Sequence, residues 1–172
     1  LYSDRSQIAL RWIAEPDLEI TRAFWRERLL RAAAFRQRMI GEAEAYRLVF
    51  AESDGLPSLI VDRYGDYFVL QTLSQGMEAL KPLWIELLVE LFAPRAIVER
   101  NDVKVRALEG LPPAKGVLYG TLPERVEIAL GDGRFHVDLL HGQKTGAFLD
   151  QQENYRAAAR YARGRVLDGF CY

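Results

Sequence analysis

The sequence has one cysteine, almost no net charge and no long apolar run, and each shortage excludes a class of protein. Cys171 alone rules out an internal disulfide framework and a cysteine zinc cluster, so a reducing, cytoplasmic setting is expected. The formal net charge of −1 gives no global positive field, so nucleic acid would have to bind a local patch. No apolar run approaches the roughly 18 residues of a membrane helix, so no membrane partner is expected.

Histidine is also scarce, and two kinds of motif are missing. His136 and His141 lack a third ligand nearby, so no metal site is predicted. No G-x-x-x-x-G-K-[ST] phosphate loop is present, which argues against an unrelated nucleotide-binding enzyme. The first residue is Leu1 rather than Met, so we expect the natural start to be missing.

Short apolar runs and two helical patterns occupy the first two thirds of the chain. One helix is predicted over residues 19–40, where five apolar residues share a stripe: Trp25, Leu29, Ala32, Phe35 and Met39. Leucines at helical spacing predict another helix, over residues 80–91. Strands are predicted at residues 7–13, 46–50, 58–62, 67–73 and 96–99. This order, strand, helix, three strands, helix, strand, predicts an α+β fold, an antiparallel sheet with two covering helices.

The remaining third differs in pattern. Residues 108–123 are rich in Gly and Pro, which predicts a loop and a domain boundary between residues 1–115 and 116–172. Two alternating runs around Gly131-Asp132-Gly133 predict a β-hairpin. Asp150 and Glu153 form a capping pattern, so a helix should begin at Gln151. Residues 165–170 (RVLDGF) then have the apolar character of a buried strand.

Charged residues offer two further candidate sites. Six arginines crowd the first helix, where they could contact an RNA backbone, but their helical angles scatter around the axis, which favours a solvated face. Four acids also gather between positions 52 and 66, and turn chemistry explains them better than acid–base catalysis: Glu52, Asp54, Asp62 and Asp66.

The stretch GQKTGAFLDQ follows the predicted hairpin. Gly142 and Gly146 allow close backbone approach or a positive φ. Gln143, Lys144 and Thr145 supply an amide, a cation and a hydroxyl as hydrogen-bond donors. Phe148 offers a flat aromatic face on which an adenine or a base could stack. The alternative is a β-to-α connection with a polar tip, in which the aromatic ring is tucked into the packing, and composition alone favours this alternative.

The stretch VLDGF has two interpretations of equal weight. A carboxylate at the end of a buried strand, here Asp168, can accept hydrogen bonds from a ribose or an amino group. Equally, Asp168 could cap the next turn, because short motifs of this kind often occur by chance.

Several segments together resemble one known family, the PUA-linked class I S-adenosylmethionine-dependent RNA methyltransferases of the ribosomal RNA large-subunit methyltransferase I type, which act at cytosine C5. The similarity covers nearly the whole chain in the family's order, at residues 6–13, 47–66, 101–111, 142–151 and 166–172. It implies a parent with a PUA module, a central α+β domain, and a Rossmann-like methyltransferase domain. Residues 1–115 would be the central domain, and residues 116–172 the hairpin, first helix and first strand of the methyltransferase domain.

The resemblance implies that S-adenosylmethionine is the cofactor and RNA, ribosomal RNA above all, is the partner. By resemblance, the cofactor site would be lined or supported by Gln143, Lys144, Thr145, Phe148, Asp168 and Phe170. Two departures thin the apolar packing, since Ala147 stands where the family usually has Phe and Gly169 where a larger residue is usual.

The family's glycine-rich turn, its acidic ribose ligand and its Asn-Pro-Pro-type motif cannot be assigned here, so we expect a fragment that is inactive alone. No residue of this chain is predicted to be catalytic, and Cys171 is interpreted as a small buried residue rather than a nucleophile. The alternative function is a noncatalytic RNA-binding or interdomain scaffold module. The sequence leaves open whether the protein forms a homodimer.

Overall fold

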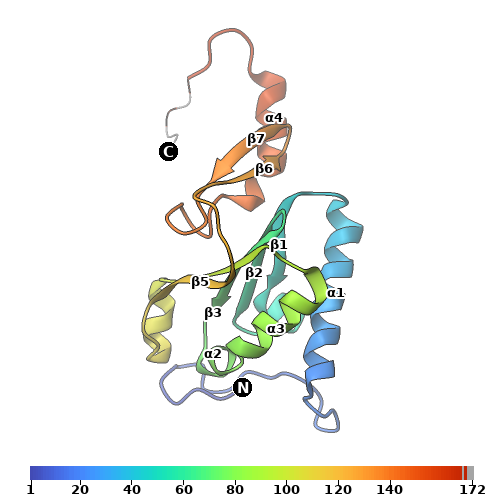
Figure 1. Cartoon of the computed structure of the whole chain (residues 1–172), viewed down its shortest axis with the longest axis vertical. Coiled ribbons are helices and arrows are strands. Elements are labelled where there is room, and N and C mark those ends of the chain that lie inside the picture. The colour runs from blue at the N-terminus through green and yellow to red at the C-terminus, as the bar shows by residue number, and fades with distance from the viewer. Residues whose placement is uncertain (168, 170–172) are drawn as a thin grey trace.

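A computed structural model describes residues 1–167 and 169 of the chain, and it contains two β-sheets (Figure 1). In chain order the helices (α), strands (β) and short 3-10 turns (η) are α1 (Arg22–Ile40), β1 (Ala45–Phe50), η1 (Ala51–Asp54), β2 (Leu59–Tyr64), β3 (Tyr67–Thr72), α2 (Gln75–Ala79), α3 (Lys81–Phe92), β4 (Ala96–Asn101), η2 (Lys104–Glu109), β5 (Ala114–Gly120), β6 (Val126–Leu130), β7 (Gly133–Val137), η3 (Leu149–Gln151) and α4 (Gln152–Tyr161). This mixture of a mainly antiparallel sheet and helices confirms the predicted α+β class.

The larger sheet has the strand order β1-β2-β3-β4-β5. Strands β1 to β3 form the predicted antiparallel meander, and β5 returns antiparallel to β4. The sheet is antiparallel, as predicted, except at one junction, where β4 runs parallel to β3. Helices α2 and α3 connect these two strands, and a crossover of this kind is what brings a strand back in the same direction.

Helices α1 and α3 cover one face of this sheet. Trp25 of α1 and Trp84 of α3 meet edge to face with ring centroids 5.2 Å apart, and both are buried. Leu29 and Ala32 continue the buried stripe of α1 as predicted. Phe35 and Met39 leave that stripe, with 44% and 63% of their surface exposed, because the last turns of α1 border an open groove rather than the core.

The β6–β7 hairpin packs on the opposite face of the sheet. Successive side chains of a strand point to opposite faces, and Val61 joins the helix-side core whereas Tyr64 joins the hairpin-side core. The hairpin contributes buried apolar side chains to this second core: Val126, Ile128, Leu130, Val137 and Leu139. Figure 1 shows the hairpin and α4 above the sheet, and the N-terminal segment beneath it.

Several predicted elements differ from the structure. Residues 7–13 form no strand, because their backbone makes only an isolated bridge between Tyr2 and Leu10 instead of joining the sheet. Helix α1 begins at Arg22 rather than near residue 19, because Thr21 caps it by accepting a hydrogen bond from the Phe24 N–H at 3.3 Å. Residues 108–123 are not all loop, since they contain β5.

Strand β5 crosses residue 115, so the first sheet continues past the predicted boundary, and the division into domains stays a prediction. Helix α4 begins at Gln152, one residue later than predicted, after the short turn η3. Residues 165–167 pair with no described strand. Asp168, Phe170, Cys171 and Tyr172 lie outside the described residues, and with them the rest of the predicted strand. None of the helices in the described part of the chain is long and apolar enough to cross a bilayer.

Candidate functional site

An open groove of about 1180 Å³ runs between the end of α1 and strand β1 on one side and residues 144–156 on the other. Three predicted site residues line it: Lys144, Thr145 and Phe148. Gln143 is exposed but is not part of the lining, and its carbonyl accepts a hydrogen bond from the Gly146 N–H at 2.8 Å. The structure therefore brings three of the six predicted residues together, places one beside them, and does not describe Asp168 and Phe170.

Lys144 and Phe148, the two exposed residues among the three that line the groove, interact with each other. The Lys144 ammonium lies 5.6 Å from the centroid of the Phe148 ring, within the range of a cation–π contact. Phe148 keeps 37% of its surface exposed, so a flat ligand has access to the ring. A stacking face beside one cation can hold a molecule that carries both an aromatic base and a carboxylate.

Thr145 behaves differently from its neighbours, because only 3% of its surface is exposed. Its hydroxyl donates a hydrogen bond to the Asp62 carboxylate at 2.6 Å. Asp62 also accepts two hydrogen bonds from its cross-strand partner Arg47, at 2.8 Å and 3.1 Å. This hydrogen bonding to Asp62 is the largest influence on the Arg47 guanidinium and raises its pKa.

Tyr64 completes this buried network. Its hydroxyl lies 3.1 Å from the Thr145 hydroxyl and accepts a hydrogen bond from the Ala147 N–H at 3.2 Å. Because Thr145 gives its only proton to Asp62, Tyr64 must be the donor in the bond between the two hydroxyls. Burial raises the pKa of Tyr64 to about 12, although the bond to Thr145 acts in the opposite direction.

Arg100 of β4 holds the start of the same loop. Its Nη1 donates to the carbonyls of Leu139 and Gly142, at 3.2 Å and 3.0 Å, and its Nε donates to Asp102 at 3.1 Å. The guanidinium is almost completely buried, so the hydrogen bonds to carbonyls satisfy donors that water cannot reach. Residues 139–147 are thus attached to the larger sheet at two places.

Sequence reasoning missed the roles of Asp62, Tyr64 and Arg100. Asp62 was attributed to turn chemistry, but it lies inside β2 and has no exposed surface. One signal was available in the sequence, since a carboxylate within the apolar run LIVDRY must find buried partners if the strand is central. The residue that supplies the hydroxyl, 83 positions later, could not be identified from spacing.

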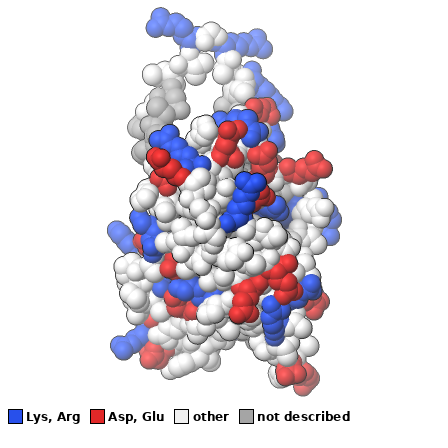
Figure 2. Space-filling model, viewed as in Figure 1, with Lys and Arg blue, Asp and Glu red and all other residues white. Residues whose placement is uncertain are grey.

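The arginines of α1 are mostly paired with acids. Arg22 and Arg26 both bind Glu90, at 2.7 Å and 2.8 Å, and Arg36 binds Asp54 through two hydrogen bonds. Figure 2 shows positive and negative side chains interleaved over the visible face, without a continuous basic stripe. The structure thus favours the solvated-face interpretation of this helix over an RNA contact.

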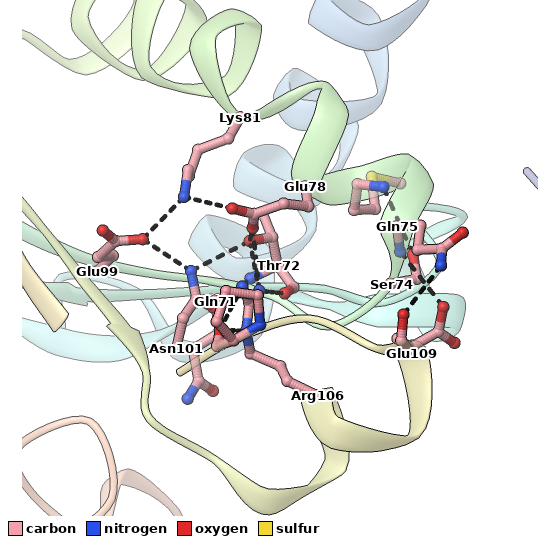
Figure 3. Close-up of polar contacts among 12 residues, drawn as sticks. Gln71, Thr72, Ser74, Gln75, Glu78, Lys81, Glu99, Asn101, Arg106 and Glu109 are labelled. Carbon is pink, nitrogen blue, oxygen red and sulfur yellow. Dashed lines mark hydrogen bonds and ion pairs between the residues drawn. The ribbon is translucent and has the colours of Figure 1, made fainter. Parts of the chain in front are cut away.

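A second polar cluster lies at the other end of the sheet, beneath α2. Figure 3 shows Lys81 between Glu78 and Glu99, at 2.6 Å and 2.9 Å, with the buried guanidinium of Arg106 below. Arg106 donates to Glu78 of α2 at 2.9 Å, to the Pro112 carbonyl at 3.1 Å and to the Thr72 carbonyl of β3, and the last of these bonds ties η2 to the sheet. Burial would raise the pKa of Glu78, but hydrogen bonds from Arg106, Lys81 and Thr72 outweigh it and lower the pKa to about 2. The charged groups of this cluster bind one another through hydrogen bonds and ion pairs, which fits a structural role.

Metal chemistry has no support in the part of the chain that the structure describes. No group of three or more His, Cys, Asp or Glu side chains there could hold a metal ion. His141 instead lies beside Asp138, whose carboxylate accepts the backbone N–H groups of Leu140 and His141 at 2.9 Å and 2.8 Å.

Comparison with known proteins identifies relatives along the whole chain. No family model matches it. The chain is 43% identical over 99% of its length to a protein of Shewanella amazonensis named ribosomal RNA large subunit methyltransferase I, and 42% identical to one of the same name from Aliivibrio fischeri. These alignments cover 44% of each relative, so the chain spans less than half the length of the curated relatives it matches. The predicted resemblance to this family is confirmed.

Two solved structures share the fold. A putative SAM-dependent methyltransferase from Streptococcus mutans superposes with a TM-score of 0.72 at 19% identity, covering 91% of this chain and 40% of that one. A putative methyltransferase complexed with SAH gives 0.71 at 19% identity, covering 89% of this chain and 39% of that one. At this identity the likeness establishes the fold alone.

Proposed function

We propose that this chain is part of an S-adenosylmethionine-dependent methyltransferase that modifies a base of ribosomal RNA in the cytoplasm. The single observation that carries the proposal is the match, over 99% of the chain, to relatives named ribosomal RNA large subunit methyltransferase I. In this proposal residues 1–115 act as the central domain, and residues 116–172 begin the catalytic domain. The groove residues then form only one wall of the cofactor site, consistent with a chain that spans 44% of its relatives.

The residues present fit the cofactor. S-adenosylmethionine supplies the methyl group through its sulfonium, and it also carries an adenine and a carboxylate. The exposed ring of Phe148 can stack the adenine, and the Lys144 ammonium can neutralise the carboxylate. Thr145 supports this wall from behind, because its hydroxyl is already bonded to Asp62. Gln143, Asp168 and Phe170 remain proposed cofactor residues.

No residue of the chain is assigned to the chemical step. The described residues around the groove position a ligand, and alignment of the methyl donor with a base is itself a large part of methyl-transfer catalysis. The alternative, a noncatalytic RNA-binding or scaffold module, would use the same sheet and hairpin without a cofactor.

The test uses the complete gene product, purified and supplied with S-adenosylmethionine carrying a labelled methyl group and with in vitro transcribed large-subunit ribosomal RNA. The expected result is label in the RNA, and much less label with a variant in which Lys144→Met and Phe148→Ala are combined. A folded protein that binds this RNA but neither transfers the methyl group nor binds S-adenosylhomocysteine would support the scaffold alternative. Light scattering on the same preparation decides whether it is a homodimer.

A further inference from the structure

The loop over residues 142–147 divides its side chains between the protein interior and the groove. Thr145 points inward and is buried, whereas Lys144 is exposed and lines the groove. Lys144 has a backbone φ of 56°, in the left-handed region, and Gly146 has a φ of 140°. A non-glycine residue in the left-handed region is disfavoured, so contacts made by its neighbours must hold it there.

The hydrogen bond from Thr145 to Asp62 can hold Lys144 in this left-handed conformation. Asp62 has no exposed surface and is absent from the groove lining, so it cannot touch a ligand in the groove. It accepts from Thr145 at 2.6 Å and from Arg47 at 2.8 Å, and Arg47 is itself part of the groove wall. One carboxylate therefore joins the loop to strand β1 beneath the groove.

The direction of the hydrogen bonds makes this contact specific. The Ala147 N–H can only donate, so the chain must run from Ala147 through Tyr64 and Thr145 to an acceptor at its end. A carboxylate accepts at every lone pair and serves both Thr145 and Arg47. An amide in its place has one accepting oxygen and an NH2 group that donates, so the NH2 would face either Arg47 Nε or the Oδ2 side, where Thr145 and Arg47 Nη2 donate, and the negative charge that Arg47 pairs with would be lost.

We propose that Asp62 is a positioning residue, which rests on the proposed function: it fixes Thr145 so that Lys144 and Phe148 present a preformed face to S-adenosylmethionine. It makes no contact with the cofactor. The sheet on which Asp62 lies thereby takes part in cofactor affinity, although the cofactor belongs to the following domain.

The first experiment is a double-mutant cycle in the complete gene product, with S-adenosylhomocysteine affinity measured by calorimetry. Asp62→Asn and Lys144→Met should each weaken binding by about tenfold, and the double variant should be little weaker than either, because Lys144 is already misplaced without Asp62. Thr145→Val should reproduce Asp62→Asn, whereas Thr145→Ser, which keeps the hydroxyl, should bind like the wild type. Glu109→Gln is the matched control, since that buried carboxylate binds Arg11 far from the loop.

A second readout needs no ligand. Trypsin cleaves after lysine, and cleavage at Lys144 requires the loop to open locally. The unliganded Asp62→Asn and Thr145→Val variants should be cut there several times faster than the wild type, and Glu109→Gln should not. If Asp62→Asn does not fold, Thr145→Val and Thr145→Ser are compared instead, in both the affinity measurement and the trypsin cleavage.

The outcomes separate this proposal from the one on which it rests. Unchanged affinity in folded Asp62→Asn, or losses that multiply in the double variant, would overturn the positioning role. Equal trypsin cleavage in wild type and variants would overturn it as well. A folded wild-type protein that binds no S-adenosylhomocysteine would instead overturn the proposed function, and with it the cofactor role of Asp62, while faster cleavage would still show that Asp62 holds the loop.

Discussion

Gly146 packs directly against Tyr64: a Cβ added at Gly146 would lie 3.3 Å from Cζ of the Tyr64 ring. The same Cβ would meet side-chain atoms of Leu139 and Val137 at 2.8 Å, which is closer than real Cβ contacts allow. With its φ of 140°, this position requires glycine for two independent reasons. The close approach is what lets the loop after the hairpin lie against the larger sheet.

Gly146→Ala should therefore destabilise the protein by about 1–3 kcal/mol, through overpacking and backbone strain. Gly116→Ala is the matched control, because its Cβ would meet nothing within 4 Å and its φ is not positive. Urea unfolding of both variants makes the comparison. Equal stability of the two would mean that the loop does not pack on Tyr64.

The buried stripe of α1 predicts that truncating two apolar residues of this helix, Leu29 and Met39, lowers stability by very different amounts. Leu29→Ala should cost about 2–5 kcal/mol, because Leu29 has no exposed surface and its loss leaves a cavity between α1 and the sheet. Met39→Ala should change stability by less than about 0.5 kcal/mol, because 63% of Met39 is exposed. Urea unfolding with an unchanged m-value provides the measurement. A similar loss in both variants would show that the whole stripe is core.

The cluster around Glu78 predicts a loss of stability in acid. Its pKa is lowered from 4.5 to about 2 in the folded protein, so its contribution is complete above pH 4.5. That contribution is lost as the pH falls from about 4.5 towards 2, when the carboxylate takes up its proton and its bonds to Arg106 and Lys81 weaken. The urea midpoint of Glu78→Gln should fall less steeply than that of the wild type in this window. If the urea midpoints of the wild type and Glu78→Gln fell in parallel with pH, Glu78 would not be a cause of the loss of stability in acid.

The buried Tyr64 predicts a loss of stability at high pH rather than in acid. Burial raises its pKa from 10.0 to about 12, so the neutral phenol stabilises the fold below pH 10, and this contribution is lost as the pH rises through 12. An ultraviolet titration of the phenols should contain a late component that is missing from Tyr64→Phe. If the variant titrates like the wild type, Tyr64 is not buried beside Thr145.

Local patterns were enough to predict most of the fold. Alternation and turn chemistry gave the meander and the hairpin, because both depend on neighbours in sequence. The parallel pairing of β3 with β4 was not predicted, since strand direction depends on how the crossover packs rather than on composition. Strand β5 was missed because its glycines and the flanking prolines are turn signals, and the edge position that tolerates them is a tertiary property.

The candidate site was predicted only in its exposed half. Lys144 and Phe148 face the groove, as residues of a binding loop should. Thr145 was grouped with them by its place in the motif, but its hydroxyl is turned to Asp62 in the interior. Sequence adjacency shows which residues share a loop, whereas the side to which each one points depends on backbone angles such as the positive φ of Lys144.

The most direct test of the central claim is a crystal structure of the complete gene product with S-adenosylhomocysteine. The account predicts density for the ligand in contact with Lys144 and Phe148, with Thr145 turned away from it and bonded to Asp62. Density for the ligand at a site remote from residues 143–148, with the groove filled by solvent alone, would contradict the account.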